Sequence, residues 1–343
     1  MGPLSGVRVV EFEGLGPGPL AGLFLAQMGA EVTLIRRPQA GAVASRLGGG
    51  SGADLLRAGK HSVALDLKLP GSVEQALSLL DGADALIEGN RPGVMERLGL
   101  GPTVCLARNP RLVYGRMTGW GQTGPLAQSA GHDLNYVALT GLLSLAAAPG
   151  ALPRVPPTVI GDAGGALGLA FGIVCAVLQA RSTGRGQVVD AAIVDIAASL
   201  GTLVHWAKGA GQIDGPAPSP FHDSPFYDVY ACADGGAITI AALEPQFYAL
   251  LLKTLGLDDV DPAKQYDREQ WPALKARFSA LFASQPRAHW CHVLEGTDVC
   301  FAPVLNLDEA AQHPHLQARG TLHRDGGTLQ AAASPQFFDP NRR

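Results

Sequence analysis

Two short segments carry side chains that could move a proton to and from a carbon atom. Residues 131–136 read Gly-His-Asp-Leu-Asn-Tyr and place His132 beside an aspartate. Residues 161–165 read Gly-Asp-Ala-Gly-Gly and offer Asp162, followed by glycines that let a substrate approach the backbone closely. One imidazole and one carboxylate are the minimum for taking a proton from one face of a carbon and returning one to the other. His132 and Asp162 are therefore the candidate acid–base pair.

These residues also have purely structural explanations. A histidine in a Gly-His-Asp turn can serve as a local hydrogen-bonding group. Asp162 can cap the apolar helix that follows it, because aspartate satisfies free amides at a helix start. Glu244, which precedes Pro245, also has the position of a helix-start residue. The residue types alone leave both interpretations open.

The other histidines and the cysteines do not predict a metal site. The pairs His289/His292 and His313/His315 imitate metal-ligand spacing but have no third ligand nearby. The five cysteines are scattered, odd in number and without a C-x-x-C pair, which is typical of reduced thiols in a cytoplasmic protein. The first residues also lack the basic and apolar regions of a secretory signal.

Composition narrows the class of protein. The 343 residues are 47% hydrophobic and 16% charged, which favours a folded enzyme with one large and one smaller domain. The net charge of −4 gives no general attraction to nucleic acid. The apolar stretch 166–180 is too short to span a bilayer and contains Gly168 and Gly172, so we expect a buried helix and no membrane partner.

The order of predicted elements indicates an α/β fold with a doubly wound, mostly parallel sheet in a Rossmann-like large domain. Strands are predicted over 7–12, 31–35, 62–66, 83–88 and 112–116, with helices over 20–28 and 73–80. From 188 to about 208 the apolar positions recur at helical spacing, which gives Asp190 and Asp195 places at a helix start and on its face.

The second half of the chain has a different pattern. Residues 227–242 predict a hairpin that turns at Asp234-Gly235-Gly236, and helices are predicted over 245–255, 271–283 and 287–295. We therefore divide the chain into a large domain (1–200), a linker (201–222), a small α+β domain (223–305) and a C-terminal segment returning to the large domain (306–343).

The turn after the first strand does not fit a dinucleotide fingerprint. Pro17 and Pro19 remove amide donors that a pyrophosphate would need. The second strand ends in Arg36-Arg37 instead of an acidic residue for an NAD ribose. A basic pair at this place suits a nucleotide with an extra ribose phosphate, such as coenzyme A.

Several longer segments resemble one family over nearly the full length. These are residues 3–11, 86–101, 114–125, 131–136, 183–190, 244–248 and 302–305. With them the chain resembles the α-methylacyl-CoA racemases of the family III (CaiB/BaiF-type) CoA-transferase superfamily. The resemblance implies the family III fold, an acyl-CoA thioester as substrate, no separate cofactor because CoA is part of that substrate, and an interlocked homodimer. Each active site of that dimer would use the large domain of one chain and the small domain of the other.

The resemblance also implies roles for individual residues. His132 and Asp162 match the catalytic pair of the racemases, and Glu244 matches a glutamate that supports the histidine. The residues expected to contact CoA are Arg37, Lys68, Gly89, Arg91, Arg97 and Tyr136. The implied reaction interconverts (2R)- and (2S)-2-methylacyl-CoA by cofactor-free two-base 1,1-proton transfer through an enolate.

Two other functions remain open. Transferases of the superfamily use the matching aspartate as a nucleophile, so Asp162 could instead move CoA between carboxylic acids. A non-catalytic CoA-binding protein is the third possibility. Three positions depart from the racemase pattern: Thr158, Ala163 and Phe221–Ser224. The resemblance implies that their segments approach the acyl group. We therefore expect intact proton-transfer machinery with an altered acyl pocket.

Overall fold

The computed structural model describes residues 2–38, 55–147, 150–325 and 327–337. The chain divides into two compact units, Met1–Gly201 with Gly320–Arg343, and Thr202–Arg319. Each unit has its own hydrophobic core.

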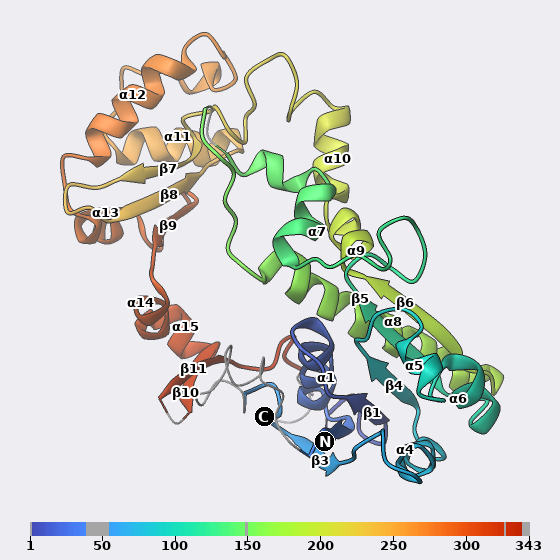
Figure 1. The fold of residues 1–343 in the computed structure, drawn as a ribbon. Helices are drawn as coiled ribbons and strands as arrows, with labels where there is room; N and C mark the ends of the chain where they lie inside the picture. Colours follow the sequence, from blue (N-terminus) through green and yellow to red (C-terminus); the bar gives the residue numbers. More distant parts are fainter. Residues whose placement is uncertain (1, 39–54, 148–149, 326, 338–343) are drawn as a thin grey trace. The chain divides into compact units, whose positions relative to one another are not determined.

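The first unit is built on a six-stranded sheet in which every pair of neighbouring strands is parallel (Figure 1). Its order is β3-β2-β1-β4-β5-β6. The strands are β1 Arg8–Phe12, β2 Glu31–Arg36, β3 Lys60–Ala64, β4 Ala85–Glu88, β5 Val113–Thr118 and β6 Gln187–Ala192. The chain order reverses between β1 and β4, which is the topological switch point of a doubly wound sheet. The predicted fold class is confirmed.

Alternating strand residues send side chains to two apolar layers. Val9 and Ile87 join the layer that includes α1 (Pro17–Gln27) and α8 (Gly164–Thr183). Val10 and Leu86 join the opposite layer, with α4 (Ser72–Leu80), α5 (Val94–Arg97) and α6 (Pro102–Arg108). Helices on both faces bury the sheet on both sides and leave the carboxyl ends of its strands as the place for a site.

Residues 187–192 form strand β6, so the prediction of a helix from 188 onward is wrong there. The strand pairs with β5 from Val113↔Gln187 to Thr118↔Ala192. Asp190 consequently lies in the strand and not at a helix start, and its carboxylate accepts a hydrogen bond from the Gln122 amide at 3.1 Å. Helix α9 begins only at Ile193 and ends at Leu200.

Helix α8 is longer than predicted. It has 20 residues and follows directly on a π-helical turn, η2 (Val159–Ala163). By length and composition alone the combined helix Val159–Thr183 could cross a membrane, so the helix extends well beyond the predicted stretch 166–180 and is not too short. One side of it belongs to the core, as predicted, with Leu169, Ile173 and Val177 among its buried residues.

The glycines of α8 allow close packing. A Cβ at Gly168 would lie 2.6 Å from Ile196, and one at Gly172 would lie 2.9 Å from Val189. Helix α8 can therefore approach α9 and β6 more closely than an alanine would permit.

The first unit also contains α7 (Asp133–Leu139), the short helix η1 (Leu142–Leu145) and a C-terminal hairpin of β10 (Leu322–Asp325) and β11 (Thr328–Ala331). The second unit holds an antiparallel sheet of β7 (Tyr227–Ala231), β8 (Ala237–Ala241) and β9 (Phe301–Val304). Its helices are α10 (Thr202–Gly209), α11 (Pro245–Thr254), η3 (Pro262–Lys264), α12 (Trp271–Phe282), α13 (Arg287–Leu294), α14 (Leu307–Gln312) and α15 (Pro314–Ala318).

The β7–β8 hairpin and the three helices predicted after it are present in the second unit. Two predicted boundaries differ from the structure. Residues 202–209 of the predicted linker are helical, because their apolar positions continue the spacing of α9. Helices α14 and α15 belong to the second unit, so the chain returns to the first unit at Gly320 and not at 306.

Candidate active site

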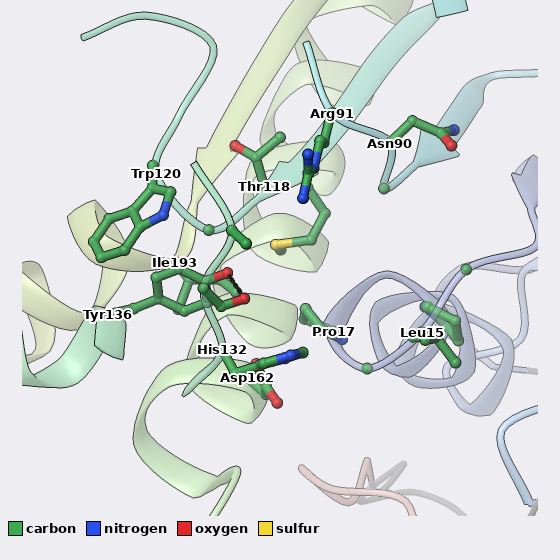
Figure 2. Close-up of a pocket in the computed structure, with 18 of the residues that line it drawn as sticks. Leu15, Pro17, Asn90, Arg91, Thr118, Trp120, His132, Tyr136, Asp162 and Ile193 are labelled. Atoms are coloured by element: carbon green, nitrogen blue, oxygen red, sulfur yellow. Dashed lines mark hydrogen bonds between the residues drawn. The ribbon is translucent and has the colours of Figure 1, made fainter. Parts of the chain in front are cut away.

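A cavity of about 740 Å³ opens at the carboxyl edge of the parallel sheet. Its walls come from the segments that follow four strands, including Leu15 after β1, Arg91 after β4, Trp120 after β5 and Ile193 after β6 (Figure 2). This is the switch point between β1 and β4, where open α/β sheets bind their ligands. The described residues that line the cavity belong to the first unit.

His132 and Asp162 line this same cavity. His132 precedes the first turn of α7, and its backbone N–H donates to Asn135 Oδ1 at 3.1 Å. Asp162 lies in the π-helical turn before α8, at a point where an added Cβ on Gly16 would lie 3.8 Å from its Oδ2. The structure thus brings together the two residues that the sequence proposed as an acid–base pair.

The surroundings of Asp162 shift its protonation equilibrium toward the neutral form. Partial burial raises the pKa of this carboxyl group, and the negative charge of Asp133 raises it further, while His132 acts in the opposite direction. A carboxyl group with a raised pKa can hold a proton for donation closer to neutral pH.

Asp133 follows His132 directly, and the sequence alone predicts no role for it. Its buried carboxylate accepts hydrogen bonds from the Gly161 and Asp162 amides at 2.8 Å each, and from the Thr158 amide at 3.2 Å. The only signal in the sequence was its place beside His132.

Tyr136 forms an aromatic wall of the cavity together with Trp120. The two rings meet edge to face, with centroids 4.7 Å apart and an interplanar angle of 83°. The Tyr136 hydroxyl donates to the Gly131 carbonyl, and burial raises the pKa of this hydroxyl. An added Cβ on Gly119 would overlap the Tyr136 ring, which explains why that position needs glycine.

Gly89 and Arg91 also line the cavity, on the loop that follows β4. The buried Glu88 carboxylate accepts the Asn90 amide at 2.7 Å and forms an ion pair with Arg116 at 2.9 Å. Burial raises the pKa of Glu88, while the Asn90 amide and Arg116 oppose that effect. The buried Glu88 carboxylate therefore anchors the backbone of this loop at Asn90.

A second cavity, of about 510 Å³, contains Arg37 and Lys68. Glu13 and Asn90 line both cavities, so the two meet there. Glu13 also accepts the Arg37 amide at 3.0 Å and pairs with Arg57 at 3.0 Å. Five of the six predicted CoA contacts thus line one of two adjoining cavities. Arg97 is exposed on α5 and is not among the described residues that line either cavity.

A fully buried ion pair lies at one side of the first cavity. Lys60 Nζ donates to Glu11 Oε2 at 2.6 Å and to the Pro19 carbonyl at 2.8 Å, and the two side chains are 0% and 1% exposed. Burial raises the pKa of Glu11 to about 7, and Lys60 opposes this effect. The pair ties the first turn of α1 to β1 and β3.

Glu244, the third predicted catalytic residue, lies in the second unit, where it is exposed immediately before α11. In the described part of the chain no three His, Cys, Asp or Glu side chains gather into a group that could hold a metal ion.

Comparisons with known proteins agree with this geometry. The sequence profile of CoA-transferase family III matches residues 4–342. The chain is 41% identical to α-methylacyl-CoA racemase from Mus musculus, over 95% of this chain and 84% of the mouse protein. It is 31% identical to acetyl-CoA:oxalate CoA-transferase from Acetobacter aceti, over 100% of this chain and 92% of that protein.

A solved structure of a CaiB/BaiF family protein from Brucella suis superimposes with a TM-score of 0.83. The two sequences are 25% identical, and the match covers 98% of this chain and 93% of the Brucella chain. With a profile match over almost its whole length, the chain belongs to CoA-transferase family III.

Proposed function

We propose that this chain is an isomerase that interconverts (2R)- and (2S)-2-methylacyl-CoA thioesters by 1,1-proton transfer. The observation that carries the proposal is the placement of His132 and Asp162 in one cavity at the switch point of the sheet. The identity of 41% to a mouse protein named α-methylacyl-CoA racemase supports it.

The proposed reaction needs one proton acceptor and one donor. A thioester acidifies the neighbouring C–H, so one group takes that proton and the bonding electrons move to the thioester oxygen as an enolate. The other group then returns a proton to the opposite face of the carbon, and the C=O bond is restored. His132 and Asp162 exchange these roles with the direction of reaction, and the raised pKa of Asp162 keeps its acid form accessible. No metal, flavin or nicotinamide takes part in these steps.

The two adjoining cavities suit the two ends of a CoA thioester. Arg37 and Lys68 in the second cavity supply cationic donors for phosphate, which pairs well with such groups. Gly89, Arg91 and Tyr136 in the first cavity lie near the acid–base pair, where the thioester would bind. Arg97 on α5 remains a proposed contact from the resemblance alone.

We also propose that the protein works as an interlocked homodimer in which Glu244 of one chain supports His132 of the other. An apolar stripe on α8 supports a second copy as partner, since Leu167, Phe171 and Leu178 are 59%, 71% and 64% exposed. Large apolar surfaces left exposed on a protein mark interaction sites.

Complementation tests this assembly. His132→Ala and Glu244→Gln chains are expected to be weakly active alone. A mixed dimer is expected to regain one intact site, since one site then combines the unchanged His132 with the unchanged Glu244. No recovery in a mixed dimer isolated through two different tags would refute the interlocked arrangement.

We propose the cytoplasm as the location, because all five cysteines are free thiols and none forms a disulfide. Cell fractionation with a tagged chain tests this proposal.

The test of the reaction is α-proton exchange in deuterated buffer. We expect a single 2-methylacyl-CoA enantiomer to gain one deuteron at Cα, detected by mass spectrometry. His132→Ala and Asp162→Ala should each slow the exchange by about 10²–10⁴-fold, the usual contribution of a general acid or base. Absence of exchange in dimeric wild-type protein, with a panel of branched acyl-CoAs, would refute the proposal.

The alternative is transfer of CoA between carboxylic acids with Asp162 as nucleophile. It is favoured by the identity of 31% to an acetyl-CoA:oxalate CoA-transferase over the full chain. Such an enzyme forms an acyl-aspartyl anhydride, which hydroxylamine converts to a hydroxamate at Asp162. A hydroxamate at this residue, together with CoA appearing on an added free acid, would identify a transferase.

A further inference from the structure

Asp133 forms the centre of a hydrogen-bond network around the turn that carries Asp162. Its Oδ1 accepts the amides of Gly161 and Asp162, and its Oδ2 accepts the amide of Thr158. Asp133 is 7% exposed, so these three donors replace the water that a carboxylate needs. From this geometry we propose that Asp133 is a positioning residue that holds the Asp162 carboxyl group in place for the reaction.

The turn that Asp133 holds has an unusual backbone. Thr158 has φ of +64°, in the left-handed region that a β-branched residue rarely adopts. The following five residues form a π-helical turn, closed by a hydrogen bond from the Ala163 amide to the Thr158 carbonyl at 2.9 Å. Conformations of this kind persist only where the surroundings stabilise them. The three bonds to Asp133 supply that stabilisation, because hydrogen bonds from amides to a carboxylate are stronger than those to a neutral acceptor.

Gly161 makes this close contact possible. A Cβ at this position would lie 2.5 Å from Asp133 Oδ1 and 3.3 Å from Asp133 Cα. The glycine in the sequence Gly-Asp-Ala-Gly-Gly is thus needed for the approach of Asp133, in addition to any approach of a substrate.

The position of Asp133 in the chain connects the two proposed acid–base groups. His132 immediately precedes Asp133, which is the first residue of α7. The same dipeptide therefore carries one group of the pair and fixes the backbone of the other. Proton transfer to and from one carbon depends on this relative placement, since a misplacement of about 1 Å can cost about 10²-fold in rate.

Asp133 also acts on Asp162 through its charge. Its negative charge is the second cause, after burial, of the raised pKa of Asp162. Removal of the charge is therefore expected to lower that pKa. An asparagine also loses the acceptor for the Thr158 amide and offers the Gly161 and Asp162 amides only a neutral, weaker acceptor.

The inference rests on the proposed proton transfer, so the wild-type exchange rate is measured first. We then compare Asp133→Asn with Asp195→Asn, which changes an exposed carboxylate on α9 of the same unit. We expect Asp133→Asn to lower kcat for α-deuteration by about 10–100-fold, while the Kd for free CoA changes less than about threefold. The acidic limb of the pH–rate profile of Asp133→Asn should move to lower pH. Asp195→Asn should have the kcat, the Kd and the pH–rate profile of the wild type.

Hydrogen exchange of the wild-type protein adds a measurement that needs no variant. The amides of Gly161 and Asp162 should be strongly protected, and the protection should fall in Asp133→Asn while the sheet amides stay unchanged. Wild-type exchange at these two amides as fast as in exposed loops would overturn the inference. A wild-type kcat and pH profile in Asp133→Asn would also overturn it. Absence of deuteration in the wild type refutes the proposed function and leaves the amide protection as a separate readout of the Asp133 network.

Discussion

Replacing Lys60 by methionine should destabilise the first unit strongly. Lys60→Met keeps most of the side-chain volume but leaves Glu11 buried without its counter-charge, in a place where both side chains are at most 1% exposed. Removal of one partner from a buried ion pair costs about 3–5 kcal/mol, because the remaining charge is neither solvated nor paired. For a unit of this size that corresponds to a fall in Tm of about 6–20 °C.

The double variant Glu11→Met/Lys60→Met separates loss of the charge pair from loss of packing. Replacement of a whole buried pair by apolar side chains is often neutral. The Pro19 carbonyl still loses its donor from Lys60, which costs about 1–3 kcal/mol. We therefore expect the double variant to be more stable than Lys60→Met alone, although it carries one more substitution.

Urea-dependent hydrogen exchange of peptides from β1 and α1 measures this effect. These segments report on the first unit, and the method does not require the two units to unfold together. A loss below about 1 kcal/mol in Lys60→Met would refute the reasoning. So would a double variant less stable than the single one, since either result means that the charge of Glu11 is relieved in some other way.

Three further outcomes are expected. Gly119→Ala should cost about 1–3 kcal/mol of unfolding free energy and raise KM, because its Cβ would displace the Tyr136 ring; an unchanged urea midpoint would contradict this. Arg37→Ala and Lys68→Ala should each raise KM for CoA thioesters about tenfold, equivalent to about 1.4 kcal/mol. The KM for pantetheine thioesters, which lack the nucleotide, should not change, and an equal rise for both substrates would exclude contact with the nucleotide phosphates. In the direction in which Asp162 is the base, the rate should fall as the pH drops through its raised pKa. The acidic limb of the pH–rate profile should therefore lie above pH 3.8, and a limb at or below that value would contradict the raised pKa.

The strands were predicted correctly where the apolar residues formed one continuous run and did not also fit helical spacing. Runs such as Val7–Phe12, bounded by turn residues, are typical of buried parallel strands, and β1 lies there. At 187–192 the apolar residues fit helical spacing as well as a strand. Only the pairing with β5 decides between the two, and that partner is about 70 residues away in the chain.

The candidate site was predictable only as far as residue type and motif allow. His132 and Asp162 stood out because an imidazole and a carboxylate can do acid–base chemistry. The role of Asp133 could not be predicted, since it depends on amides 25–29 residues further along the chain and on the positive φ of Thr158. The ion pair between Glu11 and Lys60 could not be predicted either, because the sequence around each residue gives no sign of its partner.

The wall that the two cavities share has a consequence for inhibitor design. Glu13 and Asn90 line both spaces, so one fragment bound in the first cavity and a second fragment bound in the other would meet at these two side chains. Joining such fragments by a short spacer makes the second binding event intramolecular, with an effective concentration in the millimolar range. Linked fragments should therefore bind this fold far more tightly than either half, without carrying the full nucleotide of CoA.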